Sequence, residues 1–582
     1  MTMSTFLHQH VSLDDLPFRD STHNYLFLGG VGLLSLLLLN YTYLVLAYHR
    51  AHSKENKTNG QLPPHYPFFL PFFGPLLQIW WDHGGFAHRV SSYAGKLTSN
   101  RFSVFGHTFY NFQDRETIEK LFKHPALSSS INMYSYVNSY LLGTPNYAMG
   151  VYRADDSGPF PHPHAKSSVL PHNRIDHITH HSVFRGLTGP GLQPSGLRFA
   201  QNLHRRLDEL DIPEDWVHKP DFTTFFREVV GAAALEAILG PAMLRLNPTF
   251  VKDIFKFDHM FPTFGPGLPR FMMPESYSFR DGLVQQFKNW YKHARKNYDA
   301  SQTFADGDGD PWWGSTMMRL RQDSIKGADN QDDESLARVD LGLAWAIIGN
   351  VVTSSMFSAF HVFKDKDLLS RVQQELTEHV GPDGTLKDVD PHKLGKDATL
   401  LLSVYAETLR KYIKVYSVYS TPHEDVDLGK WVLPKGELAI LNSDPCHRDE
   451  NFWNTRNGRH PLDGFWAERF IVDPQDPDSG PINRACRQKA LPQEKLASGK
   501  PFFSTEGCDG AWIPYGGGFS MCPGRFLAKN IIVYSSAVLA SKFDIDIEPD
   551  TIAFTKKRYG MGVEDLAGPI PFRIRKRATS PK

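Results

Sequence analysis

Residues 512–530 read WIPYGGGFSMCPGRFLAKN, and this stretch predicts a tight turn followed by a helix. Gly516, Gly517 and Gly518 let the backbone turn sharply and approach a flat group closely, because glycine has no Cβ atom. Beyond the turn, apolar residues recur at helical spacing: Leu527, Ile531, Tyr534 and Val538. Cys522 is therefore expected just before the N-terminus of an apolar-faced helix. The helix dipole and free N–H groups lower the pKa of a thiol there, so Cys522 is predicted to be a metal-binding thiolate.

Composition excludes several functional classes. The chain has 582 residues, enough for several domains or for one large domain with an anchor. Its 63 basic and 63 acidic residues give a formal net charge of zero, so no nucleic-acid partner is indicated. The cysteines of the chain are Cys446, Cys486, Cys508 and Cys522. They are too few and too late in the chain for a disulfide framework, and they do not form the Cys-x-x-Cys pairs of a zinc site.

The N-terminal region contains an uncharged apolar segment from Tyr25 to Tyr48. It is long enough to cross a hydrocarbon core about 30 Å thick. Arg50, Lys54 and Lys57 follow it, so the positive-inside rule places the remainder of the chain in the cytosol. We predict a lumenal tail, a transmembrane anchor, a basic and proline-rich linker and a catalytic domain, at residues 1–24, 25–48, 49–75 and 76–582.

A second apolar run extends from Leu341 to Phe363 and could be read as another membrane span. Asn350, Thr353 and several serines within it argue against exposure to lipid. We therefore expect one long helix buried in a large soluble core.

Two further segments are unusual in composition. Residues 151–181 are rich in histidine, and His177 and His181 stand four apart, a spacing that could ligate a metal on a helix. No third ligand follows at a telling interval, so a solvated loop is expected there. Residues 255–274 are rich in Phe, Pro and Gly, a composition that breaks helices and exposes apolar side chains.

The turn at Cys522 resembles the haem-binding loop of the cytochrome P-450 superfamily. That loop has an aromatic residue, a glycine three residues later, and then Cys-x-Gly. The matching positions here are Tyr515, Gly518, Cys522 and Gly524. The family usually has Phe where Tyr515 stands, and commonly a basic residue, which pairs with a haem propionate, where this chain has Ser520.

Further matches to the family occur in the expected order. Glu407 and Arg410 form a Glu-x-x-Arg pair on a predicted helix, and Arg469 lies in a later segment, FWAERF, that also resembles the family pattern. The resemblance implies that these three residues form a buried structural network, because buried charges are tolerated only when paired. His447-Arg448-Asp449 matches as well.

The second apolar run resembles the helix that crosses the distal face of the haem. We align Gly349 to Thr353 with the family pattern Ala/Gly-Gly-x-acid-Thr. Val352 stands where the family has the acid. Asn350 stands in the glycine position, and an asparagine near this position resembles the sterol-7-hydroxylase and prostacyclin-synthase branch of the family. Thr353, with help from Asn350, would then order water for proton delivery. Replacing Val352 by Asp is expected to be tolerated.

The resemblance implies a mainly α fold with small β-sheets, the cytochrome P-450 fold with an N-terminal transmembrane helix. It implies haem b ligated by Cys522, and a monooxygenase that oxidises an apolar small molecule with electrons from NADPH through a separate reductase. The expected location is the endoplasmic reticulum membrane, which the chain would cross once, with the catalytic domain in the cytosol. The long linker between Phe470 and the cysteine loop resembles fungal enzymes of secondary metabolism. A haem-thiolate isomerase or dehydratase that needs no reductase remains an alternative, and a non-catalytic haem sensor is another.

Overall fold

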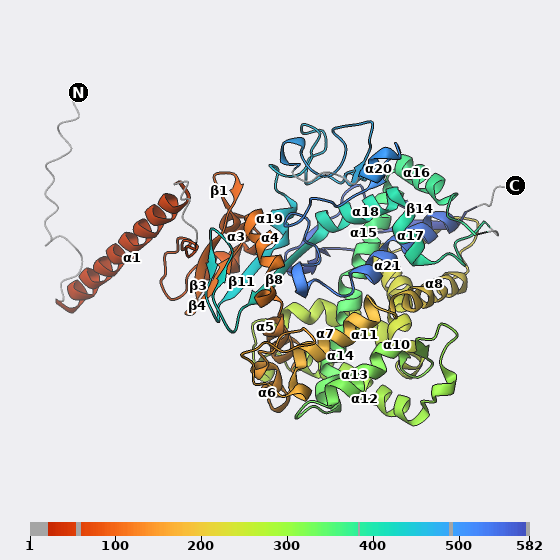
Figure 1. Cartoon of the computed structure of the whole chain (residues 1–582), viewed down its shortest axis with the longest axis horizontal. Helices are drawn as coiled ribbons and strands as arrows, with labels where there is room; N and C mark the ends of the chain where they lie inside the picture. Colours follow the sequence, from red (N-terminus) through yellow and green to blue (C-terminus); the bar gives the residue numbers. More distant parts are fainter. Residues whose placement is uncertain (1–20, 54–59, 382–383, 488–492, 578–582) are drawn as a thin grey trace.

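The protein is a helical body from which one long helix projects (Figure 1). The computed structural model describes residues 21–53, 60–381, 384–487 and 493–577. Most of the predicted tail, and Lys54 and Lys57 of the predicted basic cluster, lie outside the described residues. The expectation of a mainly α protein with small sheets is confirmed.

In the described part of the body, the longer helices are α8 (Leu192–Glu209), α10 (Ala232–Leu246), α12 (Pro274–Asn297), α14 (Asp333–Gly349), α15 (Val351–Lys364), α18 (Thr399–Tyr412) and α21 (Arg525–Lys542). The others are α1 (Ser21–Ser53), α2 (Leu76–Trp81), α3 (His83–Ser91), α4 (Arg115–Lys123), α5 (Ile131–Tyr136), α6 (Asn146–Ala154), α7 (Ile175–Leu187), α9 (Phe222–Phe226), α11 (Phe250–Met260), α13 (Thr316–Lys326), α16 (Lys366–Leu376), α17 (Pro391–Asp397), α19 (Ser443–His447) and α20 (Gln493–Ala497). Helix α21 is almost entirely buried and packs against α15, where the hydroxyls of Ser358 and Ser536 are 3.0 Å apart. Small residues at this crossing let the two helices approach closely.

The largest sheet has five strands in the order β16-β8-β11-β4-β3, and only the β11–β4 pair is parallel. Its strands are β3 (Asn100–Val104), β4 (His107–Asn111), β8 (Ile413–Ser420), β11 (Leu438–Asn442) and β16 (Met561–Val563). A three-stranded sheet joins β5 (Val217–Lys219), β14 (Phe543–Ile547) and β18 (Phe572–Lys576). The remaining strands form two-stranded ribbons: β1 (Ser92–Tyr93) with β2 (Lys96–Leu97), β6 (Gly309–Asp310) with β7 (Gly314–Ser315), β9 (Val426–Asp427) with β10 (Val432–Leu433), β12 (Ile471–Val472) with β13 (Phe502–Phe503), and β15 (Phe554–Thr555) with β17 (Asp565–Leu566).

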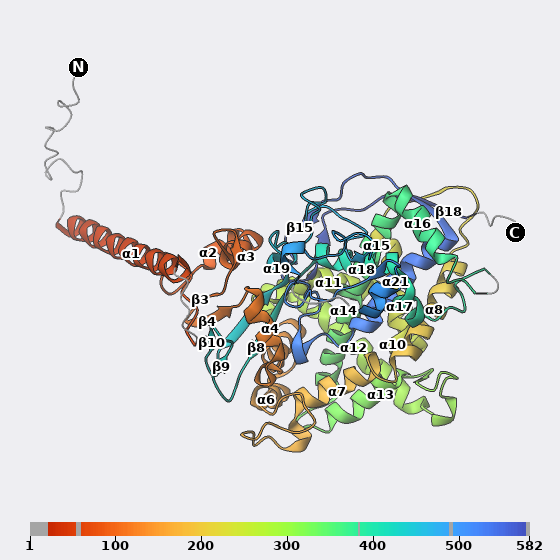
Figure 2. The ribbon, with the colours of Figure 1, turned by 45° about the horizontal axis from the view of Figure 1, so that its top comes forward.

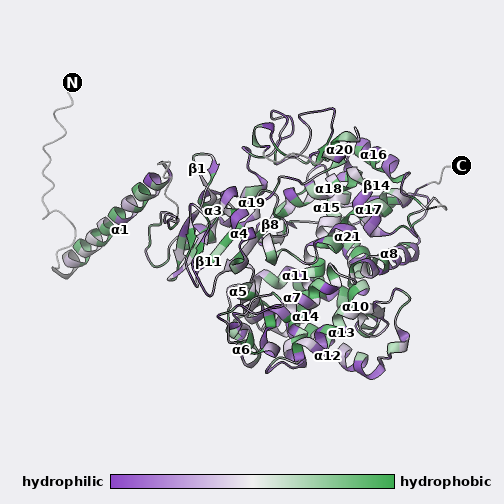
Figure 3. Cartoon of the chain, in the orientation of Figure 1, coloured by the Kyte–Doolittle hydropathy of each residue, from purple (hydrophilic) through white to green (hydrophobic). Residues whose placement is uncertain are grey.

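Three helical segments in the described part are long and apolar enough to cross a membrane. The first, Tyr25–His52 within α1, has no buried residue in its 18-residue apolar window, and most of the helix stands clear of the body in both views (Figures 1 and 2). Its apolar character shows as green along the helix in Figure 3. The other two, Phe222–Leu246 and Asp333–Lys364, are largely buried inside the body. Residues 25–52 are therefore the candidate membrane anchor, and the second apolar run is a core element, as expected.

The C-terminal end of α1 packs on the body. Tyr48 is buried among aromatic rings, with ring centroids 5.9 Å from both Tyr66 and Tyr93. The hydroxyl of Tyr93 also lies 2.9 Å from Nδ1 of His49. The proline-rich segment that follows is extended and tied to the body, since the N–H of Tyr66 donates to the carbonyl of Arg101 at 2.8 Å.

The second apolar run forms one long, largely buried helical segment, Asp333–Lys364, as expected, but it is interrupted at a single residue, Asn350. Helix α14 begins at a capping box in which Asp332 and Ser335 exchange hydrogen bonds, and it ends at Gly349. Helix α15 starts at Val351, so Asn350 sits at a break between them. Hydropathy could not reveal the break, because both halves are equally apolar.

Two other expectations need correction. Helix α11 continues to Met260, so residues 255–274 become irregular only after that point, where short 3-10 turns cover Phe261–Phe264 and Arg270–Met272. His177 and His181 lie on α7 and not in a loop, with ring centroids 5.5 Å apart. Among the described residues, no group of three or more His, Cys, Asp or Glu could hold a metal ion.

Candidate active site

Cys522 lies in the turn between the 3-10 helix Gly518–Ser520 and α21, as the sequence predicts. Its N–H donates to the carbonyl of Tyr515 at 3.0 Å, and Gly524 caps the helix. Ser520 donates to the carbonyl of Ser128 at 2.5 Å, so the residue at the usual basic position serves here to fix the turn.

The glycines of this turn are required by packing against α4. A Cβ atom on Gly517 would overlap the ring of Phe122, and one on Gly518 would come within 2.6 Å of the Phe122 carbonyl oxygen. Gly518 also has φ +64°, in the left-handed region that glycine tolerates. The flat group that the turn approaches is therefore at least partly the side chain of Phe122, and no sequence pattern pointed to this partner.

The Cys522 side chain is solvent-accessible, although the surrounding protein desolvates the thiol. Burial raises the pKa of Cys522, and the N–H groups of Gly524 and Arg525 together with the Arg525 guanidinium oppose that shift without reversing it. The predicted lowering of the pKa by the helix N-terminus is thus wrong in its net direction. A thiol that is both accessible and desolvated borders an internal space, and a bound metal would be needed to hold it as thiolate.

Helix α18 is linked to the cysteine turn by two aromatic contacts. The hydroxyls of Tyr405 and Tyr515 are 2.9 Å apart. Trp512 Nε1 donates to the carbonyl of Ala406 at 3.2 Å, and its ring lies 6.3 Å from both tyrosine rings. Tyr515, expected as the aromatic residue of the turn, therefore anchors it through its hydroxyl, a contact that the more usual Phe could not make.

The structure brings Glu407, Arg410 and Arg469 together, each with no exposed surface. Arg410 donates to both carboxylate oxygens of Glu407, at 2.7 and 2.8 Å, and Arg469 donates to one of them at 3.0 Å. Burial by itself would raise the pKa of Glu407, but the two guanidinium groups lower it overall. The carboxylate therefore stays ionised inside the body.

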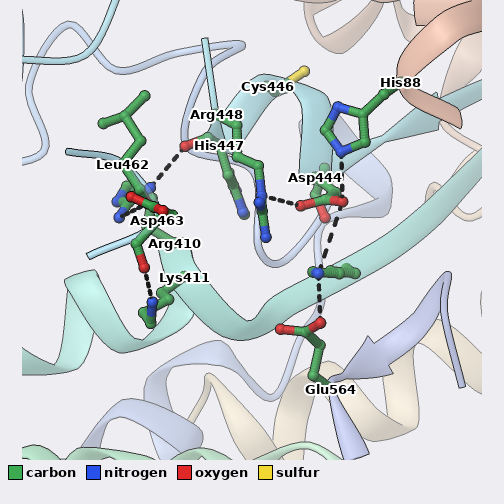
Figure 4. Close-up of polar contacts among 12 residues, drawn as sticks. His88, Arg410, Lys411, Asp444, Cys446, His447, Arg448, Leu462, Asp463 and Glu564 are labelled. Atoms are coloured by element: carbon green, nitrogen blue, oxygen red, sulfur yellow. Dashed lines mark hydrogen bonds and ion pairs between the residues drawn. The ribbon is translucent and has the colours of Figure 1, made fainter. Parts of the chain in front are cut away.

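His447 connects this network to the cysteine turn. Arg410 donates to the carbonyl of His447 at 2.9 Å (Figure 4), and Nε2 of His447 accepts from the N–H of Ile513 at 3.1 Å. Burial, followed by the charge of Arg410, lowers the pKa of His447 to about 3, so the ring is neutral and can accept. The same figure shows Asp444 held between His88 and Arg448, at 2.9 and 2.8 Å.

The distal helices have a stripe of accessible positions. Ala346 is exposed, whereas the other residues of α14 are buried or half-buried, and Asn350 and Thr353 follow it at helical spacing as half-buried residues. Open space therefore lies beside this stripe. Oδ1 of Asn350 accepts from the N–H of Val563 at 3.1 Å.

Val352 points away from that stripe and has 1% of its surface exposed. Its Cγ2 would lie 3.6 Å from a Cβ atom built on Gly231, so the side chain packs into the core. An aspartate there would be an unpaired buried charge, which contradicts the expectation that Val352→Asp is tolerated. The valine is thus explained by packing.

The residues at Cys522 fit a haem better than a bare metal ion. Structural and catalytic metal ions usually take three or four protein ligands, whereas this turn offers one sulfur atom. Phe519 on this turn and Phe526 in the first turn of α21 expose 45% and 38% of their surface, an apolar border for a flat ring. A cofactor that brings its own metal and equatorial ligands suits that donor set. Fold and site together therefore define a haem-thiolate protein.

Comparisons with known proteins agree. The family model for cytochrome P450 matches residues 245–479. The chain is 30% identical to the cytochrome P450 monooxygenase efuG of Hormonema carpetanum over 94% of this chain and 97% of the relative. It is 28% identical to the monooxygenase fsoE of Humicola fuscoatra over 89% and 88%, and 21% identical to mouse cytochrome P450 7B1 over 56% and 57%. The chain belongs to the cytochrome P450 family, and it is an oxidoreductase of the haem-thiolate monooxygenase type.

Proposed function

We propose that this protein is a membrane-anchored monooxygenase that oxidises an apolar small molecule in the biosynthesis of a secondary metabolite. Its cofactor would be haem b, with its iron held by Cys522. Electrons would come from NADPH through a separate reductase. We place it in the endoplasmic reticulum membrane, single-pass, with the catalytic domain in the cytosol.

The observation that carries this proposal is the accessible thiol of Cys522 at the start of the buried helix α21. When bound, a thiolate-ligated haem supplies oxygen activation, because the thiolate pushes electron density through the iron and favours O–O cleavage. Cys522 would hold the iron, and Tyr515, Gly518 and Gly524 would hold the turn in the shape that presents the sulfur.

The residues of the distal stripe would manage protons and water. Thr353 would order a water molecule through its hydroxyl, which can both donate and accept. Asn350, three residues earlier, would donate from its Nδ2 group to the same water, while its Oδ1 accepts from Val563. Val352 takes no part, since it faces the core.

Exposed apolar side chains between α11 and α12, and on α2 near the candidate anchor, support an apolar substrate. Phe271 exposes 82% of its surface and Met272 57%, in the turn between α11 and α12. Trp80 and Trp81 on α2 are also strongly exposed. Large exposed apolar side chains of this kind are typical of lipid-facing surfaces, where an apolar substrate would enter.

The first test is the spectrum of the reduced protein with carbon monoxide. The wild type should show the red-shifted band of thiolate-ligated haem, and Cys522→Ala should lose it. Cys486→Ala is the matched control, since Cys486 is also accessible in part but lies outside the turn. A normal band in Cys522→Ala would overturn the assignment.

A redox-neutral isomerase or dehydratase is the second candidate, favoured only by the replacement of the usual acid by Val352. Steady consumption of NADPH and O₂ with a reductase, in step with product, supports monooxygenation. Conversion of a peroxide-type substrate without reductase would establish the second candidate instead.

A further inference from the structure

Asp258 joins three elements on the distal side of the body. It is buried on α11 and accepts from Nε1 of Trp345 on α14 at 2.7 Å. Its other oxygen accepts from Nη1 of Arg558 at 2.6 Å, and Arg558 has only 5% of its side chain exposed. Arg558 belongs to the segment between β15 and β16, residues 556–560. Helix α11, helix α14 and this segment are thus fixed to one carboxylate.

A second contact holds the same segment a few residues later. The N–H of Val563 on β16 donates to Oδ1 of Asn350 at 3.1 Å. Gly562 has φ +138°, and a Cβ atom there would overlap Oδ1 of Asn350. Glycine is therefore needed at 562 for Asn350 to reach the backbone.

Both contacts meet at the break between α14 and α15. A Cβ atom on Gly349 would lie 3.1 Å from Oδ1 of Asp258 and 3.4 Å from Nη2 of Arg558. The other side of the segment is bounded by β8, because a Cβ atom on Gly560 would overlap the ring of Tyr416. Residues 556–563 are therefore wedged between the helix break and the largest sheet.

We propose that Asp258, Trp345, Arg558 and Asn350, here called the distal latch, set the position of residues 556–563 and so shape the substrate space beside Thr353. Asn350 then acts chiefly through its oxygen, as a positioning residue. The latch keeps this wall in one place, so that substrate is held in one orientation and excess water is excluded. The part of this inference that concerns substrate rests on the proposed function.

The physical reason is that a buried ion pair adds little net stability, but each charge holds the other in place because neither can be buried alone. Bringing Asp258 and Arg558 out of water costs free energy that their attraction only roughly offsets. Removing one partner leaves the other charge buried and unpaired, so residues 556–563 would shift to bring that charge into water. The Asn350 bond adds a neutral contact worth about 1 kcal/mol.

Hydrogen exchange of the haem-loaded protein measures the latch directly. Asn350→Ala and Gly562→Ala should speed exchange at Val563 and its neighbours about fivefold, the factor that corresponds to a hydrogen bond of this kind, while the carbon monoxide band stays unchanged. Gly568→Ala is the matched control, since nothing lies within 4 Å of a Cβ atom there. Asn350→Asp keeps an acceptor oxygen and should restore protection.

Turnover measurements separate positioning from simple stability. In Asn350→Ala and Gly562→Ala, product per NADPH should fall several-fold and substrate KM should rise, whereas Asn350→Asp should recover both. Trp345→Phe, which keeps the stacking on Phe261 at 3.8 Å but loses the N–H donor, should show the same changes more weakly.

Arg558→Gln is the strongest variant, and Trp345→Phe and Asn350→Ala decide the matter if it does not fold. Unchanged exchange in both Asn350→Ala and Gly562→Ala would overturn the latch, as would equal acceleration in Gly568→Ala. Absence of the thiolate band in the wild type would instead overturn the proposed function, and the exchange comparison would still stand.

Discussion

The two sides of the candidate site are held in different ways. On the proximal side, α18 reaches the cysteine turn through Tyr405 and through Trp512, and Arg410 reaches it through His447. On the distal side, the stripe around Asn350 is fixed by contacts with the C-terminal segment 556–563. The proximal side is a rigid platform for a ligand that must not move. The distal contacts involve none of the residues that hold the cysteine turn, so a change at Asn350 or in residues 556–563 should leave the sulfur in place.

The largest expected effect is at the centre of the platform. Glu407→Ala leaves two buried guanidinium groups without their carboxylate, at a cost of about 3–5 kcal/mol. Expression should give little haem-loaded protein. Glu209→Ala, at an exposed pair with Arg205 3.1 Å away, is the control and should change stability by well under 1 kcal/mol. Full haem content with slow turnover in Glu407→Ala would show that the carboxylate has a chemical role.

Gly517→Ala should be the next most damaging. The added methyl group overlaps Phe122, and overpacking of this kind costs about 1–3 kcal/mol. Thermal unfolding and haem retention measure the loss, and Gly150→Ala on α6, with nothing within 4 Å of its Cβ position, is the control. The double variant Gly517→Ala/Phe122→Ala should recover haem retention relative to Gly517→Ala alone. No recovery would mean that the turn is shaped by something other than α4.

His447 should make the platform sensitive to acid. Its pKa is lowered to about 3 by burial, whereas in the unfolded chain it is near 6.5. The unfolded state therefore binds more protons below pH 6.5, and stability falls as the pH drops towards 3, by up to about 1.4 kcal/mol per pH unit. Burial also lowers the pKa of His361 to about 3, so His361 adds to the loss of stability in acid. His447→Gln keeps an acceptor but does not titrate, so its unfolding free energy should fall less steeply, and parallel curves for the two proteins would rule this out.

The smallest effect on stability, with a large effect on chemistry, is expected on the distal side. Thr353→Ala should leave folding and the carbon monoxide band intact but release peroxide in place of product, so product per NADPH falls. Ser355→Ala on the same helix is the control, because its hydroxyl is already bonded to the carbonyl of Val351 at 2.8 Å. Unchanged coupling in Thr353→Ala would remove Thr353 from the mechanism.

Sequence reasoning succeeded where the structure is local. The position of Cys522 before a buried helix and the apolar α1 follow from short patterns, whereas the helical character of the body is implied by the resemblance to the cytochrome P450 family. The break at Asn350 and the partners Phe122 and Val563 could not be predicted, because each depends on a residue brought in from another part of the chain. The pKa of Cys522 was misjudged for a similar reason, since desolvation by distant residues outweighs the local helix N-terminus.

The packing of Tyr48 against Tyr66 and Tyr93 determines where the chain can be shortened. It means that the apolar helix α1 and the body meet at a packed contact, so the direction of the helix and the orientation of the body are linked. Shortened forms that begin after residue 53 would leave two tyrosine rings bare at that contact. A soluble form that starts just ahead of Tyr48 would keep the contact while omitting most of the apolar helix.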